Sequence, residues 1–335
     1  MMLRFALRRL ASLVPTLFGL SILLFAWLRL LPGDPARSLL GQRATPESIE
    51  RVNESYGFND PLLQQYLKYI WALLQGDLGT SISLKEPVLT AFWDKLPATI
   101  ELTVVALIFA VVIGIPLGYY AGRHQGGWTD TAVVSTSLLG VVVPVFFLAI
   151  ILKYIFAIQL GLFETANRQS SRIDAEHPTN FYVLDGIITG NLGASWDALL
   201  HLVLPGIALG TIPFAIIVRI TRASVSEVVH EDFVRTAESK GLAASTINRR
   251  HVLRNALLPV VTTIGLQLGL LLSGAVLTET VFSLGGIGQY LFDAITVRDY
   301  PVLQGFILFI ALMYALINLV VDLSYGLIDP RVRVS

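Results

Sequence analysis

The chain has 335 residues, of which 54% are hydrophobic and only 14% are charged, and its mean hydropathy is +0.67. Soluble domains carry about 25% charged residues, so this composition indicates a membrane protein. The 24 basic residues balance the 24 acidic ones, and a neutral chain has no general attraction for nucleic acid. The absence of cysteine excludes disulfides, zinc-thiolate sites and thiol catalysis, and we expect no bound metal.

Six intervals lack Asp, Glu, Lys and Arg and are long enough, or nearly so, to cross a membrane. A helix needs roughly 20 mostly apolar residues to do so, and lipid requires every backbone polar group to be satisfied internally. We therefore predict an all-α membrane protein with six transmembrane helices. The intervals lie between Arg9 and Arg29, Glu101 and Arg123, Asp130 and Lys153, Asp197 and Arg219, Arg254 and Glu279, and Asp299 and Asp322.

Basic residues near the ends of these intervals predict the orientation, because Lys and Arg collect on the cytoplasmic side. They precede the first interval, follow the second and the fourth, and end the chain, where Arg331 and Arg333 lie. Both termini are therefore predicted to be cytoplasmic, with residues 32–96 and 161–197 facing outward. The first interval is predicted to remain as an anchor, since no small-x-small cleavage site follows it.

The outer segment after the first interval contains two helical patterns. A polar helix is predicted to begin at Thr45 or Pro46, and an amphipathic run extends from Tyr66 to Leu74. For the aromatic residues of that run two interpretations stay open, a place at the membrane interface or packing against the bundle. Residues 161–197 are predicted to form an ordered loop or lid.

Small and helix-breaking residues are frequent within the apolar intervals. They allow close helix packing and local bends, and we interpret most of them as packing positions. Examples are Gly114, Gly118, Pro144, Pro205, Gly206, Gly210 and Pro213.

The stretch of residues 231–259 lies between two apolar intervals and is rich in charge. Phe233, Val234 and Ala237 fall at helical spacing, and Gly241 stands where a left-handed glycine would end a helix. A second helical stretch continues toward Pro259. Two interpretations stay open: a surface for a partner protein, or basic residues that only mark the cytoplasmic side.

Motifs for independent chemistry are missing. The chain contains no phosphate-binding Gly-x-x-x-x-Gly-Lys-Ser/Thr loop, no His-Glu-x-x-His and no Gly-x-Ser-x-Gly. No acidic residue or histidine stands near the middle of an interval, where a proton relay would need one; His201 is near the outer end of the fourth. We therefore expect a chain without enzyme activity, driven by a partner; a proton-coupled secondary transporter is the alternative from another class.

Several motifs resemble one family. EDFVRTAESKGL (231–242) and RHVLRNALLPVVT (250–262) look like the cytoplasmic EAA loop of permease subunits in binding-protein-dependent ABC importers, in the dipeptide and oligopeptide branch. Arg235, Thr236 and Ala237 replace the general Glu-Ala-Ala, as they do in the peptide and nickel branch. The resemblance extends to LPGDPA (31–36), GDLGTSI (76–82), LPATIEL (96–102) and DYPVLQG (299–305).

The resemblance implies a type I ABC importer permease in a bacterial or archaeal cytoplasmic membrane. Residues 1–96 would form an anchor and outer segment, and residues 97–330 the core, with an insertion at 161–197 and a coupling loop at 221–257. The implied partners are a paralogous second permease, two ATPase subunits that bind ATP and Mg, and an external peptide-binding protein. No cofactor is implied for this chain. Import of dipeptides or short oligopeptides is expected, with nickel chelates or glutathione as alternatives.

The resemblance also implies two sets of functional residues. In the coupling helix, apolar side chains would fill a groove on an ATPase and charged ones would pair at its rim, while Gly241 would allow a tight turn; this set is Phe233, Val234, Arg235, Thr236, Ala237, Glu238, Lys240 and Gly241. The fifth span and the turn after it would line the translocation path at Gln267, Ser273, Thr278, Glu279 and Thr280, to which we add His201.

Overall fold

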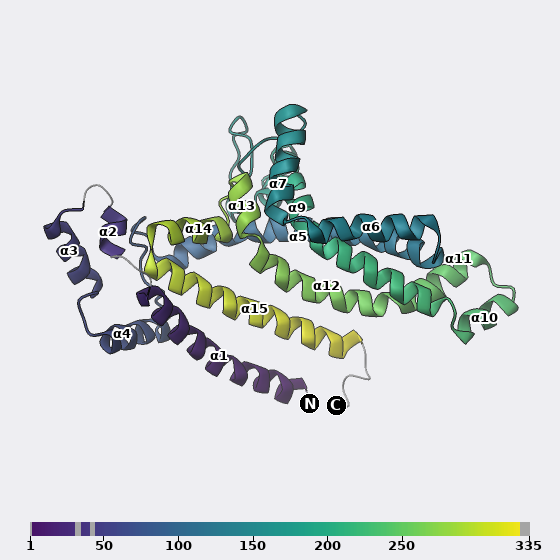
Figure 1. Ribbon diagram of the computed structural model, residues 1–335, viewed down its shortest axis with the longest axis horizontal. Coiled ribbons are helices and arrows are strands. Elements are labelled where there is room, and N and C mark those ends of the chain that lie inside the picture. Colours follow the sequence, from purple (N-terminus) through teal and green to yellow (C-terminus); the bar gives the residue numbers. More distant parts are fainter. Residues whose placement is uncertain (1, 31–34, 41–43, 329–335) are drawn as a thin grey trace. The chain divides into compact units, whose positions relative to one another are not determined.

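The computed structural model describes residues 2–30, 35–40 and 44–328 (Figure 1). Within these ranges the regular elements are helices, and a single antiparallel bridge joins Thr80 and Pro87. The chain forms two compact units, one of residues 1–97 and 286–335 and one of residues 98–285. The predicted all-α architecture is confirmed for the described residues.

The first unit combines both ends of the chain. It contains α1 (Met2–Leu30), α2 (Pro35–Leu40), α3 (Pro46–Tyr56), α4 (Leu62–Leu74), the beginning of α5 (Val88–Arg123), α14 (Ile287–Val297) and α15 (Tyr300–Ile328). The helices α1 and α15 pack side by side (Figure 1). Leu28, Phe92, Tyr290, Leu303 and Phe306 belong to the buried core of this unit.

A buried carboxylate joins two of the sequence motifs in the first unit. Asp299 is 1% exposed and accepts hydrogen bonds from the Ser81 hydroxyl (2.7 Å) and from the Ser83 amide (3.0 Å) and hydroxyl (2.8 Å). Gly79 has a positive φ of 86°, and a Cβ there would lie 3.2 Å from the Cβ of Pro301. The segment at 76–82 is therefore held against the start of α15.

The second unit is built around one long helix. The 37-residue α9 (Leu192–Val228) packs against α6 (Trp128–Val142), α7 (Val145–Leu152), α8 (Tyr182–Ile188), α12 (Arg254–Gly274) and α13 (Val276–Phe282). A π-helical turn, η2 (Lys153–Gln159), extends α7. The remaining elements are α10 (Asp232–Ser239), α11 (Ala244–Thr246) and the π-helical η3 (Ile247–Leu253).

Glycines let α5 approach α9 closely. A Cβ on Gly118 would lie 2.7 Å from the Thr221 Cβ, and one on Gly122 would lie 2.7 Å from the Arg222 carbonyl oxygen. On the opposite helix, a Cβ on Gly210 would lie 2.7 Å from the Ala106 carbonyl oxygen. Such distances admit only glycine without movement of the backbone, so the predicted packing role of the small residues is confirmed here.

The third predicted span is not a straight helix. The helices α6 and α7 are bent by 102° at the break between Val142 and Val145. Val143 is extended (φ −77°, ψ 124°), as expected for a residue before proline, and Pro144 is the N-cap residue of α7. Pro144 lacks the amide that helical bonding needs, so the span bends at one of the residues for which the sequence allowed a local bend.

Within the described residues, four helical stretches are apolar and long enough to span a membrane, or five if the bent pair counts as one span. The four are Ala11–Leu30, Val88–Arg123, Leu192–Val228 and Ala244–Leu271. The sixth predicted interval falls on α15. Six spans and cytoplasmic termini stay predictions, and Arg331 and Arg333 lie outside the described residues.

The glycine packing gives a test of the second unit. We expect Gly122→Ala to lower the thermal midpoint of the purified protein, because overpacking costs about 1–3 kcal/mol and outweighs a helix-propensity gain of up to about 1 kcal/mol. Gly19→Ala is the matched control, since Gly19 is also helical and a Cβ there meets nothing within 4 Å. Equal midpoints for the two variants would contradict the packing argument.

Candidate functional site

The segment that sequence reasoning singled out contains the predicted short helix. The helix α10 follows Glu231, which is extended, and ends before Gly241, whose φ is +69°. The Gly241 amide donates to the Glu238 carbonyl (2.9 Å) and the Leu242 amide to the Ala237 carbonyl (3.3 Å). These bonds satisfy carbonyl groups at the helix end, and the left-handed backbone explains why glycine stands there.

One side of α10 is already buried within the chain. Val234 is 1% exposed and Ala237 is 4% exposed, and both belong to a core cluster with Val225, Ile247 and Val252. The prediction that Val234 and Ala237 fill a groove on an ATPase therefore has to be corrected, because their side chains pack against this chain. They fix the helix in place instead.

The other side of α10 is exposed. Phe233 is 41% exposed, a large fraction for an aromatic side chain, and the remaining predicted residues surround it with polar groups. Arg235 and Asp232 form only a loose, solvent-exposed pair at 3.8 Å. The exposed residues of the predicted set are Phe233, Arg235, Thr236, Glu238, Lys240 and Gly241.

An ion pair fastens the end of α9 that leads into α10. Arg222 donates to both carboxylate oxygens of Asp130, through Nε to Oδ1 and through Nη2 to Oδ2 (2.6 Å). Asp130 is 3% exposed and also accepts from the Gly126 amide (2.9 Å). A bidentate pair of this kind fixes orientation as well as charge, so it holds the start of α6 on α9.

The residues predicted for the translocation path are enclosed within the second unit. Thr278 and Glu279 are fully buried, and Gln267 is 6% exposed. A carboxylate oxygen of Glu279 accepts from the Thr99 hydroxyl at 2.6 Å, and the Thr280 hydroxyl donates to the Val276 carbonyl (2.9 Å).

His201 is 7% exposed and its Nδ1 lies 2.8 Å from the Asp197 carbonyl oxygen. This geometry is that of a packed, hydrogen-bonded histidine. The side chain of Ser273 lies outside the part of the chain that the structure describes.

The segment at 161–197 is ordered by a second carboxylate. Glu101, 9% exposed on α5, accepts from Arg168 (2.7 Å) and from the Val183 amide (2.8 Å). The guanidinium of Arg168 also stacks 3.8 Å from the Tyr182 ring centroid. The prediction of an ordered segment is confirmed, and it includes the short helix α8.

Sequence reasoning did not find the pairs of Asp130 with Arg222 and of Glu101 with Arg168. The partners are separated by 92 and 67 residues, respectively. The available signal was that Glu101 and Asp130 each stand at the boundary of an apolar interval, where the sequence indicates no partner for them.

The insertion carries a pH-sensitive contact. The His177 ring stacks on Tyr182 (3.6 Å between centroids), and its Nε2 lies 2.9 Å from the Gln169 Oε1. Burial lowers the pKa of His177, with a smaller lowering from Arg168, and Asp185 and Glu101 oppose this only in part. The neutral ring is therefore the form that the folded segment holds.

The lowered pKa of His177 predicts that the segment around it is less ordered at low pH. The stabilisation is complete above the ordinary pKa of about 6.5 and is lost as pH falls through the lower folded pKa, because the unfolded segment then binds more protons. We expect hydrogen exchange of residues 161–191, corrected for its intrinsic pH dependence, to rise in that range. His177→Phe keeps a ring on Tyr182 without a titrating group and should remove the effect; an unchanged pH profile in the variant would contradict the assignment.

Two models of known protein families match this chain. Residues 114–334 match the family of binding-protein-dependent transport system inner membrane components, and residues 2–103 match the N-terminal model of the same transport systems.

Curated relatives match this chain over nearly its full length. The dipeptide transport system permease protein DppB of Alkalihalophilus pseudofirmus is 46% identical over 332 residues, covering 99% of this chain and 100% of the relative. DppB of Escherichia coli strain K12 is 44% identical over 336 residues and 99% of each chain. The glutathione transport system permease protein GsiC of Escherichia coli O6:H1 is 36% identical over 332 residues and 99% of each chain.

The apolar helices and the family match together describe a multi-pass protein of the cytoplasmic membrane. The chain belongs to the family of binding-protein-dependent transport system inner membrane components, and within it to the DppB-type ABC permeases.

Proposed function

We propose that this chain is one of two permease subunits in an ATP-driven importer of dipeptides and short oligopeptides. The observation that carries the proposal is the full-length identity of 44–46% to permeases named for dipeptide transport. The chain lacks a phosphate-binding loop, so ATP hydrolysis is assigned to two partner subunits that bind ATP and Mg. A paralogous second permease and an external peptide-binding protein complete the proposed complex.

In this proposal the ATPase contacts the exposed side of α10. Phe233 supplies the apolar anchor, since exposed aromatic residues commonly dominate protein interfaces. Arg235, Glu238 and Lys240 pair with groups around it. Val234 and Ala237, on the buried side, transmit the movement of the ATPase to the rest of the chain because they pack in its core.

Movement of the ATPase subunits would then reach the spans through rigid contacts. Close packing permits little compression, so a displaced α10 shifts the cluster beneath it and the end of α9. Arg222 and Asp130 link that end to α6, and the glycine contacts link it to α5. The helix α9 also contains His201 and begins within the segment at 161–197. The proposed coupling surface and the proposed path are therefore linked by one helix.

Import of glutathione is the second candidate, because a relative named for glutathione transport is 36% identical over nearly the whole chain. The two are separated by uptake into vesicles that contain the whole complex, with labelled dipeptide competed by unlabelled glutathione. Dipeptide uptake that requires ATP and resists glutathione supports the first; effective competition supports the second. Uptake without any ATPase subunit would overturn both.

The coupling surface gives a sharper test. We expect Phe233→Ala to weaken recovery of the ATPase in pull-downs by about 10-fold or more, as loss of an interface anchor does, and to abolish ATP-driven uptake while the folded chain stays in the membrane. Phe292→Ala is the matched control, because Phe292 is also 41% exposed but lies on α14. Normal uptake by Phe233→Ala would show that the coupling surface is elsewhere.

A further inference from the structure

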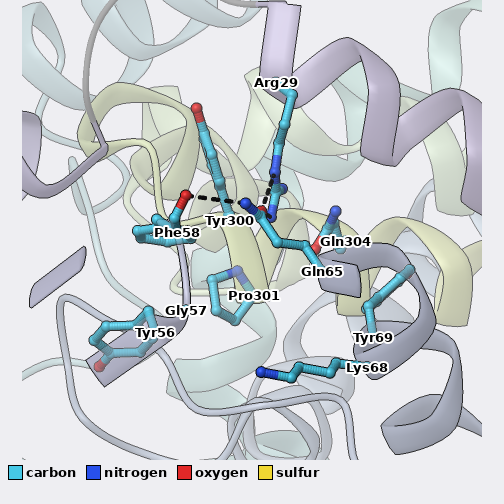
Figure 2. A pocket seen from close by; sticks show the side chains of 10 residues that line it. All are labelled: Arg29, Tyr56, Gly57, Phe58, Gln65, Lys68, Tyr69, Tyr300, Pro301 and Gln304. Carbon is cyan, nitrogen blue, oxygen red and sulfur yellow. Dashed lines mark hydrogen bonds between the residues drawn. The ribbon is translucent and has the colours of Figure 1, made fainter. Parts of the chain in front are cut away.

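A cavity of about 170 Å³ lies in the first unit, at the end of the α1 span. Its walls come from α1, α4, α15 and the turn after α3 (Figure 2). The lining residues are Arg29, Tyr56, Gly57, Phe58, Gln65, Lys68, Tyr69, Tyr300, Pro301 and Gln304. Two of them are cationic and none is acidic; Lys68 is paired with Asp60, so Arg29 is the cation through which the cavity favours an anion.

Arg29 has no counter-ion among the described residues. Its Nε and Nη2 donate to the amide oxygen of Gln65 at 3.2 and 3.0 Å. Its guanidinium lies over the rings of Phe25 (4.2 Å), Tyr300 (5.1 Å) and Phe58 (5.8 Å). A neutral amide and aromatic faces hold this half-buried group in one place but do not neutralise its charge, and a charge partly withdrawn from water is stabilised by an ionic partner.

Unused hydrogen-bond groups lie around the same cavity. The Nη1 of Arg29, the Nε2 of Gln304 and the hydroxyl of Tyr69 are buried and have no hydrogen-bond partner among the described residues. Burial raises the pKa of the Tyr69 phenol, so its hydroxyl keeps its proton and can donate. The unused Nη1 of the guanidinium and two further donors beside it match a group with several anionic oxygens. Lys68, bound to Asp60 at 2.6 Å, stands at the exposed side of the cavity.

The neighbouring surface indicates where that anion comes from. On α4 a stripe of apolar side chains is exposed, and it consists of Leu63 (71%), Leu67 (59%), Trp71 (67%) and Leu74 (75%). The opposite side of α4 packs on α1, where the Tyr66 hydroxyl lies 3.0 Å from the Ser21 hydroxyl and Phe25 contacts Tyr66 and Tyr69. Tyr66 and Tyr69 therefore pack in the bundle, whereas Trp71 is free for the membrane interface.

We propose that the Arg29 cavity binds the phosphate of an anionic membrane phospholipid, whose acyl chains lie along the exposed apolar stripe of α4. An amphipathic helix at the end of a membrane span lies at the depth of lipid headgroups, and the cavity places a cation there. Under the predicted orientation this is the outer leaflet. The site is separate from the coupling surface and does not depend on the substrate.

The test is lipid binding to the purified full chain in detergent, measured by native mass spectrometry and thermal midpoint. Phosphatidylglycerol is the probe, and inorganic phosphate and a dipeptide at equal concentration are the soluble anions for comparison. We expect bound phosphatidylglycerol and a raised midpoint, with little effect of the soluble anions because they lack acyl chains. Equal stabilisation by phosphate or by the dipeptide would overturn the lipid assignment in favour of a soluble ligand.

Variants separate binding from folding. Arg29→Gln should weaken phosphatidylglycerol binding about 10- to 100-fold, the usual effect of losing charge-assisted hydrogen bonds. Arg51→Gln is the control, since the Arg51 side chain is 73% exposed on α3 and outside the cavity.

Because Arg29→Gln can also impair folding, Gln304→Leu and Tyr69→Phe provide the second arm. Each removes one unpaired polar group, so the lipid-free midpoint should not fall while binding weakens. Unchanged binding in both of these variants would overturn the proposal.

Discussion

The contact between α5 and α9 sets the geometry of the second unit. Glycines at 118 and 122 on one helix and at 210 on the other bring the two backbones closer than any side chain would allow. In a membrane there is no hydrophobic force between apolar helices, so close van der Waals contact supplies the attraction. Because α9 also packs against the helices on its other sides, this contact determines where the segment at 161–197 and α10 can lie.

The proposed coupling to an ATPase rests on the division of α10 into two sides. Val234 and Ala237 are buried in the chain's own core, whereas Phe233 and its charged neighbours are exposed and can contact a partner. A helix that was loosely attached would yield to the partner, whereas a helix packed to interior density must move with its support. The bidentate pair of Arg222 with Asp130 extends that support to α6, so the same short helix serves stability on one side and recognition on the other.

The charged groups inside the two units differ in the kind of partner that each one has. In the second unit Asp130 and Glu101 each have a cationic partner, and Glu279 accepts a hydrogen bond from Thr99. In the first unit Asp299 is satisfied by Ser81 and Ser83. Arg29 stands apart because an amide and aromatic rings position it without neutralising it. Among the described residues no carboxylate pairs with this half-buried cation, which is the basis of the proposed phospholipid site.

The sequence by itself determined the membrane class, the start of α3 near Thr45, the short helix α10 and the left-handed Gly241. These follow from composition, helical period and glycine chemistry, which act over a few residues. Only the tertiary structure decided the size of the bend at Pro144, the burial of Val234 and Ala237, and the pairing of Arg222 with Asp130. A period of 3.6 residues shows that a helix has an apolar side but not what covers it. Whether chain or partner covers that side is settled by contacts between residues far apart in sequence.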